Sequence, residues 1–300
     1  MFSLPNNVTI IEVGPRDGLQ NESNQVSTES KLKFIHALQN AGIQEMEITS
    51  FVSPKWVPQM ADSKDIVQKA SKAGRQIVLT PNAKGVELAL EAGATSLAVF
   101  VGVSNTFNMK NINKTTKQSM EELRPLVTKL KENEIFVRAC ISTAFYCPYE
   151  GKIAIEDTIS LCKEFASWGV DELSVADTIG MANPSESYLL FSRLVEEVPN
   201  TMITGHFHDT RKMGIANIVS AMQAGITRFD TSAGGLGGCP FAPGATGNVA
   251  TEDVVNMLHT MGIHTGINLD LLCEAVSIIA PYVSRPIDTG IYRLFTMNHE

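Results

Sequence analysis

The chain has 300 residues, of which 44% are hydrophobic and 19% charged, with a formal net charge of −8 at pH 7. This size and composition fit one globular enzyme domain, and the negative charge argues against a nucleic-acid-binding surface. No apolar run approaches the length of a membrane span, and the first residues lack the pattern of a secretory signal. Five cysteines form no CxxC pair, which is typical of reduced thiols and indicates the cytoplasm.

Short apolar strands alternate with helical periodicity along the whole chain. Strands are expected at residues 8–13, 45–49, 76–80, 96–101, 136–142, 172–176, 201–206 and 228–232. Helical periodicity is clearest at residues 28–41, 62–73, 115–132, 154–168, 184–198 and 214–224. Four of the helices should end at a glycine in the left-handed conformation, each just before a strand: Gly42, Gly93, Gly169 and Gly225.

Eight strands that alternate with helices predict parallel pairing with right-handed crossovers. Eight such units close naturally into a (β/α)8 TIM barrel, and a doubly wound open sheet is the alternative. We therefore predict a single domain over residues 1–300, with the barrel proper at about 8–262 and a short C-terminal helical extension at about 266–300. A helix expected at about 269–283 could cover the barrel or meet another subunit.

The first polar motif, residues 12–20, directly follows the first strand. Pro15 and Gly18 predict a turn that presents Arg16 and Asp17 where the strand ends. Taken alone, the motif could be an aspartate that caps backbone amides beside a surface arginine.

His206 and His208 stand at the end of the seventh strand. Because side chains alternate along a strand, both point to the same face. Two imidazoles placed in this way can occupy adjacent positions on one divalent metal ion. An isolated pair of this kind would more often be two hydrogen-bonded histidines of the core, so the interpretation depends on the other motifs.

Residues 233–248 contain so much glycine and proline that they predict a loop, with Cys239 inside it. Asn248 is expected to cap a helix that runs to about Met261. A loop anchored at both ends is more typical of a lid than of a linker.

The predicted barrel brings these motifs together, because the carboxyl ends of its strands open on one face, where active sites lie. Asp17 follows the first strand, Glu47 ends the second and Asp177 follows the sixth. The two histidines and Cys239 follow the seventh and eighth strands. Independent structural residues would not be expected to gather on that face, so the sequence predicts an active site there.

Several segments of the chain resemble 3-hydroxy-3-methylglutaryl-CoA lyase. They are residues 12–22, 49–60, 147–151 and 234–248. The resemblance runs from about residue 8 to residue 270. The Arg-Asp-Gly and His-x-His elements mark a broader superfamily of metal-dependent aldol and Claisen enzymes, whereas the second and fourth segments point to the lyase.

The resemblance implies cleavage of 3-hydroxy-3-methylglutaryl-CoA to acetyl-CoA and acetoacetate, an acyl-CoA substrate, a divalent metal ion and a homodimer. The implied metal ligands are Asp17, His206, His208 and Asn248. Such a ligand set suits Mg²⁺ or Mn²⁺, although it would also take Zn²⁺, Co²⁺ or Fe²⁺. The resemblance further implies that Arg16 polarises the substrate and that Cys239 is catalytic.

The chemistry explains these residue types. Arg16 offers fixed positive charge to an enolate oxygen, and Cys239 on a closing loop can protonate the enolate carbon. Asp177 or one of the histidines could accept the proton of the substrate hydroxyl. Gln20 and Glu47, counted with Arg16 as substrate-binding residues, are expected to hold Arg16 and the metal ligands in place.

The phosphates of CoA need donors near the barrel mouth. Candidates in the loop predicted after the fourth strand are Lys110, Asn111 and Asn113, and a solvated polar loop is the alternative. Some relatives carry a lysine at the position of Ser23. The contact with CoA that the resemblance would imply at this position therefore does not carry over to this chain. The other cysteines are expected to be inert, mostly buried thiols: Cys140, Cys147, Cys162 and Cys273.

Rival functions fit parts of the pattern. A synthase of the same superfamily condenses acetyl-CoA with a 2-oxo acid, but such enzymes usually carry long C-terminal additions. An Fe²⁺ oxygenase uses two histidines and a carboxylate, usually on an all-β jelly roll, which the alternation of strands and helices opposes. A barrel that only binds metal would leave Arg16 and Cys239 without a role.

Overall fold

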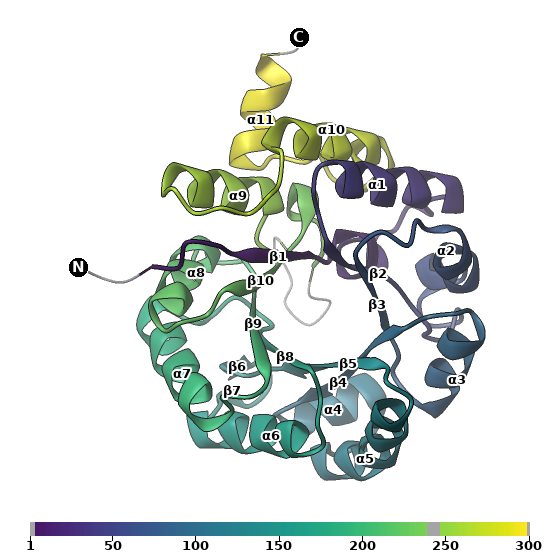
Figure 1. The fold of residues 1–300 in the computed structure, drawn as a ribbon, viewed down its shortest axis with the longest axis vertical. Coiled ribbons are helices and arrows are strands. Elements are labelled where there is room, and N and C mark those ends of the chain that lie inside the picture. Colours follow the sequence, from purple (N-terminus) through teal and green to yellow (C-terminus); the bar gives the residue numbers. More distant parts are fainter. Residues whose placement is uncertain (1–3, 239–246, 299–300) are drawn as a thin grey trace.

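The computed structural model describes residues 4–238 and 247–298, and Figure 1 shows them as a ring of strands enclosed by helices. The eight strands of the ring all pair in parallel. They are β1 (Thr9–Glu12), β2 (Glu45–Ser50), β3 (Arg75–Leu79), β4 (Ser96–Gly102), β5 (Phe136–Ser142), β8 (Glu172–Asp177), β9 (Met202–Phe207) and β10 (Arg228–Thr231). The ring closes because β1 pairs with both β2 and β10. The predicted (β/α)8 barrel is confirmed, and the open sheet is wrong.

The helices lie outside the ring of strands (Figure 1). They are α1 (Thr28–Asn40), α2 (Ser63–Lys69), α3 (Ala83–Glu91), α4 (Asn105–Ile112), α5 (Thr116–Glu132), α6 (Ile155–Ser167), α7 (Pro184–Glu197), α8 (Gly214–Gln223), α9 (Thr251–Thr260), α10 (Leu269–Ile279) and α11 (Gly290–Met297). Short turns are η1 (Gly14–Gly18), η2 (Pro58–Met60), η3 (Ala233–Gly235) and η4 (Ala280–Tyr282), and β6 (Tyr146–Cys147) pairs with β7 (Gly151–Lys152) as a hairpin.

The predicted glycine caps are present. Gly42, Gly93, Gly169 and Gly225 have φ angles of 106°, 94°, 80° and 97°. Each ends a helix in a conformation that costs little without a side chain, so the chain turns directly into the next strand.

Two regions of the barrel interior differ in character. An apolar cluster is formed by residues of β1, β3 and β4 and by the residue after β1: Ile11, Val13, Ile77, Leu79 and Ala98. A charged network is formed by residues of β2, β5, β8 and β10: Glu47, Arg138, Glu172 and Asp230. All four of the charged side chains are at most 2% exposed. The larger core lies between the outer faces of the strands and the helices.

Two local expectations are wrong. Asn248 does not cap the following helix, because α9 begins only at Thr251, after an Ala250 N-cap, and Asn248 lies in an extended bridge to His208. Lys110 and Asn111 lie in helix α4 rather than in a loop. Ser104 starts that helix, since its side chain accepts a hydrogen bond from the backbone N–H of Phe107 at 3.0 Å.

The C-terminal extension continues past the barrel as α10, η4 and α11. Helix α10 packs against α1, and α11 follows beside it with the C-terminal end of the chain (Figure 1). None of the described helices is long and apolar enough to cross a membrane.

Candidate active site

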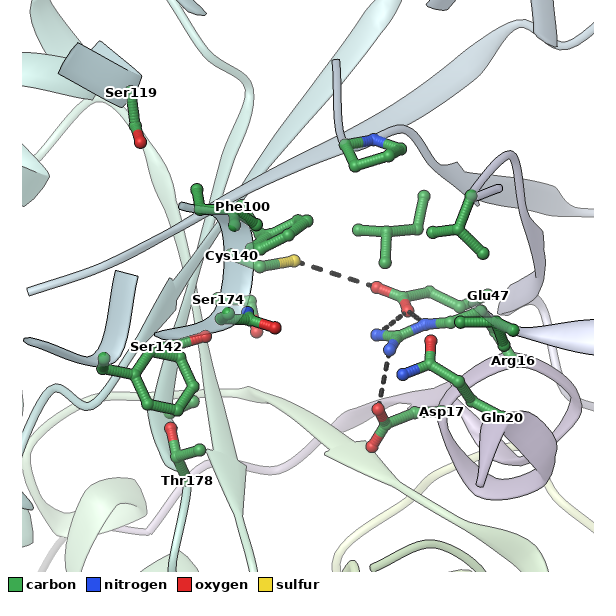
Figure 2. Close-up of a pocket in the computed structure, with 18 of the residues that line it drawn as sticks. Arg16, Asp17, Gln20, Glu47, Phe100, Ser119, Cys140, Ser142, Ser174 and Thr178 are labelled. Atoms are coloured by element: carbon green, nitrogen blue, oxygen red, sulfur yellow. Dashed lines mark hydrogen bonds and ion pairs between the residues drawn. The ribbon is translucent and has the colours of Figure 1, made fainter. Parts of the chain in front are cut away.

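A cavity of about 620 Å³ opens at the carboxyl ends of the barrel strands. Figure 2 shows Arg16, Asp17, Gln20 and Glu47 along one wall and Phe100, Cys140, Ser142, Ser174 and Thr178 along the other. His206 and His208 also line it. The predicted convergence of the motifs on one face of the barrel therefore occurs.

The turn that carries Arg16 and Asp17 is compact. The carbonyl oxygen of Val13 accepts hydrogen bonds from the backbone N–H of Asp17 at 2.7 Å and of Gly18 at 3.1 Å. A Cβ atom at Gly18 would lie 2.8 Å from the Ser232 hydroxyl oxygen, so only glycine lets the turn sit this close to the end of β10. The sequence thereby places a buried arginine and an aspartate side by side over the barrel.

The Arg16 guanidinium is held between two carboxylates. Its Nε donates to Glu47 Oε2 at 2.6 Å, its Nη2 forms an ion pair with the same oxygen, and its Nη1 donates to Asp17 Oδ1 at 2.6 Å. Burial by itself would lower the pKa of Arg16, but Glu47 and Asp17 raise it above the usual arginine value. The cavity thus contains a permanent positive charge in a fixed orientation.

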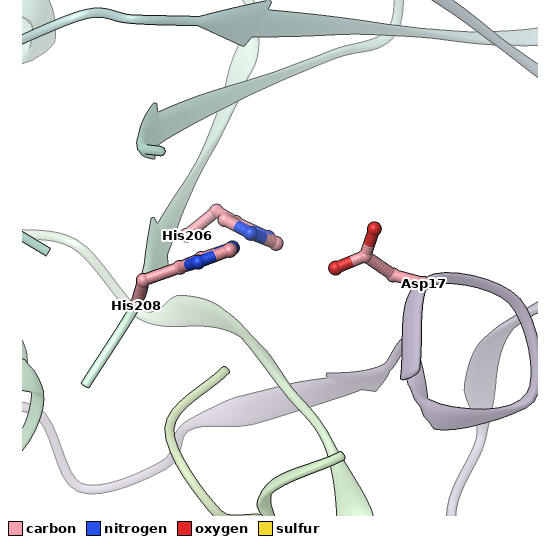
Figure 3. A group of neighbouring side chains, drawn as sticks. All are labelled: Asp17, His206 and His208. Atoms are coloured by element: carbon pink, nitrogen blue, oxygen red, sulfur yellow. The ribbon is translucent and has the colours of Figure 1, made fainter. Parts of the chain in front are cut away.

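His206 and His208 face Asp17 across a short gap (Figure 3). One candidate ligand atom from each of the three residues lies within 4.8 Å of the other two. The two imidazole rings come from the same face of β9 and its continuation, with centroids 5.3 Å apart. A carboxylate and two imidazoles this close together form a suitable ligand set for a divalent cation.

The charge states of two of these residues, Asp17 and His208, also suit a bound cation. Burial would raise the pKa of Asp17, but the neighbouring Arg16 charge lowers it to about 2, so the group is a carboxylate at neutral pH. Burial lowers the pKa of His208 to about 4, which keeps that imidazole neutral. His208 Nδ1 is buried without a hydrogen-bond partner among the described residues, and such an atom is costly unless something binds it.

Asn248 reaches the same place from the far end of the glycine-rich segment. Its Nδ2 donates to Asp17 Oδ2 at 2.7 Å and to the carbonyl oxygen of Leu236 at 3.1 Å. The structure therefore brings Asn248 next to a candidate ligand, although the amide presents its nitrogen to Asp17, whereas ligation of a cation requires its oxygen.

Asp177 lies outside this group. Side chains alternate along β8, so Glu172 and Ser174 point into the barrel while Asp177 points outward. Its carboxylate accepts hydrogen bonds from the backbone N–H groups of Met181 and Ala182, both at 3.0 Å, and burial raises its pKa to about 6. Asp177 thus fixes the turn after β8 and does not line the cavity.

Cys239 lies outside the described residues, and the segments on both sides of it are held by hydrogen bonds. Gly238 lines the cavity, and its carbonyl oxygen accepts a hydrogen bond from Asn21 Nδ2 at 3.1 Å. On the other side, the carbonyl oxygen of Gly247 accepts a hydrogen bond from the backbone N–H of Asp209 at 2.9 Å. The predicted loop is therefore anchored at both ends beside the metal-binding candidates.

The charged network beneath the cavity was not predicted from the sequence. His206 Nδ1 lies 3.1 Å from Asp230 Oδ2, and the Asp230 carboxylate also accepts hydrogen bonds from Arg138 and Ser174. A charged residue in the interior of a predicted strand was the available signal: Arg138 in Phe136–Ser142 and Asp230 in Arg228–Thr231. Cys140, expected to be an inert buried thiol, lines the cavity, and burial raises its pKa.

Of the three candidates for CoA contacts, only Asn111 is among the residues that line the cavity, and Asn113 is the C-cap of α4. Lys114, which was not predicted, also lines the cavity and forms an ion pair with Glu122. Lys110 lies 4.8 Å from the centre of the Tyr149 ring. Trp56, which is 86% exposed, also lines the cavity and offers a large aromatic surface at its rim.

Fold and site together define a (β/α)8-barrel enzyme with a candidate metal centre at the carboxyl ends of its strands. The chain belongs to the HMGL-like family, which matches residues 7–279. It is 44% identical to the hydroxymethylglutaryl-CoA lyase of Bacillus subtilis, covering 97% of this chain and 98% of that protein. It is 45% identical to the human mitochondrial hydroxymethylglutaryl-CoA lyase, covering 97% of this chain and 90% of that protein.

Solved structures agree with this assignment. The hydroxymethylglutaryl-CoA lyase of Pseudomonas aeruginosa superposes with a TM-score of 0.94 at 38% identity, covering 98% of this chain and 99% of that one. An HMG-CoA lyase from Acinetobacter, in complex with coenzyme A and 3-methylmalate, superposes with a TM-score of 0.91 at 35% identity, covering 98% and 96% of the two chains. The resemblance predicted from the motifs is confirmed.

Proposed function

We propose that this protein cleaves 3-hydroxy-3-methylglutaryl-CoA into acetyl-CoA and acetoacetate with the help of a divalent metal ion. The observation that carries the proposal is the convergence of Arg16, Asp17, His206 and His208 on one cavity. It is supported by the similarity of nearly the whole chain to hydroxymethylglutaryl-CoA lyases. The same similarity favours the lyase over a synthase that condenses acetyl-CoA with a 2-oxo acid.

The residues present fit a bound divalent cation. Asp17, His206 and His208 would hold it, and Asn248 would join them through its amide oxygen. Nitrogen and oxygen ligands of this kind suit Mg²⁺ or Mn²⁺. When bound, such a cation supplies Lewis-acid chemistry that lowers the pKa of the substrate hydroxyl.

The reaction breaks the bond between C2 and C3 of the substrate acyl group. The tertiary hydroxyl on C3 gives its proton to one of the two histidines that line the cavity, and its oxygen becomes the ketone oxygen of acetoacetate. The electron pair of the broken bond passes to C2 and is delocalised onto the thioester oxygen as an enolate. Arg16, held by Glu47 and Asp17, is placed to stabilise that negative charge, and Gln20 lies on the same wall of the cavity.

The enolate carbon must then take up a proton. We assign this step to Cys239, whose two flanking segments are anchored beside the metal-binding candidates. Asp177 points away from the cavity, so we propose that it acts as a positioning group for the turn after β8, which carries the cavity-lining Thr178.

The CoA part of the substrate requires contacts at the rim of the cavity. Coenzyme A is bound in the related Acinetobacter structure. In this chain the rim offers Trp56 for stacking and Asn111 for hydrogen bonding. Because Trp168 is the only other tryptophan, coenzyme A should quench the fluorescence of a Trp168→Phe variant, which then reports on Trp56 alone.

Assembly and location complete the proposal. A homodimer would give twice the 32.6 kDa mass of the chain in light scattering, and a monomer mass would contradict it. The described cysteines are all free thiols, which supports a cytoplasmic location, and cell fractionation would test it.

The decisive experiment incubates the metal-loaded protein with 3-hydroxy-3-methylglutaryl-CoA and measures acetoacetate and acetyl-CoA. Formation of both products in equal amounts is expected. Release of free CoA from acetyl-CoA and a 2-oxo acid, without cleavage of the hydroxymethylglutaryl thioester, would favour the synthase instead.

A further inference from the structure

We propose that Arg138, which touches neither the cavity nor a candidate metal ligand, is a positioning residue that aligns the metal centre and Arg16 at the same time. The inference rests on the metal site of the proposed function. It follows from the contacts of one buried guanidinium with carboxylates that lead to both parts of the site.

The first route leads from Arg138 to His206. Arg138 is 0% exposed, and its Nη2 lies 2.5 Å from both carboxylate oxygens of Asp230. Asp230 is the register partner of His206 in the β9–β10 ladder, and its Oδ2 lies 3.1 Å from His206 Nδ1. A histidine that donates its Nδ1–H to a carboxylate keeps Nε2 as the free acceptor, which orients the ring toward a metal ion.

The second route leads from Arg138 to Arg16. Arg138 Nε lies 3.9 Å from Glu47 Oε1, and the other oxygen of Glu47 accepts the hydrogen bond from Arg16 Nε. Glu47 thus lies between two guanidinium groups, one below it and one in the cavity. Without the charge of Arg138, the Glu47 carboxylate would lose part of the electrostatic attraction that holds it in place.

The charge balance explains why one residue serves both routes. Arg138 lies within ion-pair distance of three buried carboxylates, on Glu47, Glu172 and Asp230. Buried carboxylates are strongly unfavourable unless a cation compensates them. The Nη2 of Arg138 contacts both oxygens of Asp230, so its positive charge compensates the carboxylate that lies behind His206.

The two histidines differ in this respect. His206 has the Asp230 carboxylate behind it, whereas His208 Nδ1 has no hydrogen-bond partner among the described residues. Loss of the support behind His206 should therefore weaken metal binding directly. Loss of such a supporting carboxylate or of its partner typically weakens metal affinity by about 10- to 100-fold.

Arg228 provides a matched control. Its Nε donates to Glu172 at 3.1 Å and its Nη2 to Glu45 at 2.6 Å, so it forms a partly buried ion pair with the same Glu172 that Arg138 approaches. Its ion pairs lead to Glu45 and not to Asp230 or Glu47. A change at Arg228 should therefore disturb the packing of the barrel floor without misaligning His206 or Arg16.

The test titrates metal-free protein with Mn²⁺ in a calorimeter and measures thermal unfolding of the same samples. Arg138→Lys should raise the Kd for Mn²⁺ about tenfold, because an ammonium group cannot reproduce the two-oxygen contact with Asp230. Arg138→Met and Asp230→Asn should each raise it about 100-fold. Arg228→Lys should keep the Kd for Mn²⁺ within about twofold of the wild-type value. This should hold even if Arg228→Lys lowers the unfolding temperature as much as Arg138→Lys does.

The double variant Arg138→Lys/Asp230→Asn distinguishes misalignment of His206 from a general loss of structure. If Arg138 acts on the metal through Asp230, the double variant should bind Mn²⁺ as weakly as Asp230→Asn alone. Additive losses, or equal losses in the Arg138 and Arg228 variants, would overturn the inference. If Arg138→Met does not fold, the Mn²⁺ affinities of Arg138→Lys and Asp230→Asn still test the role of Arg138. A wild-type protein that binds no Mn²⁺ would overturn the metal site itself, whereas binding that is unchanged in the Arg138 variants would overturn only the role of Arg138.

Discussion

The apolar cluster and the charged network occupy the same barrel interior but contribute differently to the protein. Burial of the apolar side chains stabilises the fold by roughly 25 cal/mol for each Å² removed from water. Buried ion pairs contribute little net stability, and apolar replacements of similar volume are often neutral or stabilising. The charged network is therefore best understood as part of the active site, because Glu47 holds Arg16 and Asp230 holds His206. Chemistry should respond to changes in the network, and stability to changes in the cluster.

Removal of the metal should give the largest effect. A strong chelator is expected to abolish turnover, and added Mg²⁺ or Mn²⁺ should restore it. Asp17→Asn should weaken Mn²⁺ binding measured by calorimetry, because it removes the anionic group among the candidate ligands. Full activity in the presence of chelator would contradict the proposed role of the charged side of the barrel.

The substitution Cys239→Ser should give the second-largest effect. Cys239→Ser replaces the thiol by a far weaker acid, and loss of general acid catalysis typically costs 10²- to 10⁴-fold, so turnover should fall about a thousandfold. Mn²⁺ affinity should stay unchanged. Alkylation should inactivate the wild type, and bound substrate should slow that reaction. Cys162→Ser, at a fully buried thiol, is the control and should have little effect. Wild-type turnover in Cys239→Ser would show that another group donates the proton.

Arg16→Gln should lower kcat about 100-fold, with a smaller change in KM. The glutamine keeps a hydrogen-bond donor but removes the charge that stabilises the enolate, and loss of one such donor costs about this much. Steady-state kinetics would measure both constants, with Arg193→Gln, at a half-buried arginine that pairs with Glu156, as the control. A raised KM at constant kcat would make Arg16 an anchor for the anionic groups of the substrate.

Ile77→Ala tests the apolar cluster. Ile77 is fully buried, so its truncation should lower the free energy of unfolding by about 2–5 kcal/mol. The variant should keep the wild-type affinity for Mn²⁺ when assayed well below its unfolding temperature. Urea unfolding and calorimetry on the same preparation would check both statements. A large loss of metal affinity would show that the two regions are not separate.

The smallest effect is expected from the pH dependence of stability. Burial raises the pKa of Glu12 to about 7, although its carboxyl group accepts hydrogen bonds from Gly14, Ala233 and Thr251, and the neighbouring Glu252 shifts in the same direction. A carboxyl with a raised folded-state pKa binds its proton more tightly when folded. The free energy of unfolding should therefore fall as the pH rises from about 4.5 to about 7, and then level off.

Urea unfolding at pH 5 and pH 8 would measure this decline. Glu12→Gln should make it smaller, because an amide stays neutral at both pH values. Glu91→Gln, at an exposed glutamate, should leave the decline as it is in the wild type. An equally steep decline in Glu12→Gln would assign the effect to other groups, with Glu252 first among them.

The sequence alone determined the strand and helix alternation, and with it the barrel. Hydrophobic periodicity and the glycine caps are local signals, so they located all eight strands and the ends of four helices. Side chains alternate along a strand, so His206 and His208 lie on one face at the end of β9. The barrel topology then brings Asp17 close to them. These features follow from short-range geometry combined with one topological rule.

Only the tertiary structure decided which polar side chains support the site. The contacts of Arg138 with Asp230 and Glu47 join strands that are 92 and 91 residues apart in the chain, and no local pattern specifies them. Asp177 looked catalytic because it follows a strand, yet the outward direction of its side chain gives it a structural role. Asn248 looked like a helix cap, but it forms an extended bridge to His208, and its amide donates a hydrogen bond to Asp17 in the turn η1. Local sequence fixes where a residue lies along an element, whereas the partners of a buried charge depend on which elements the closed barrel brings together.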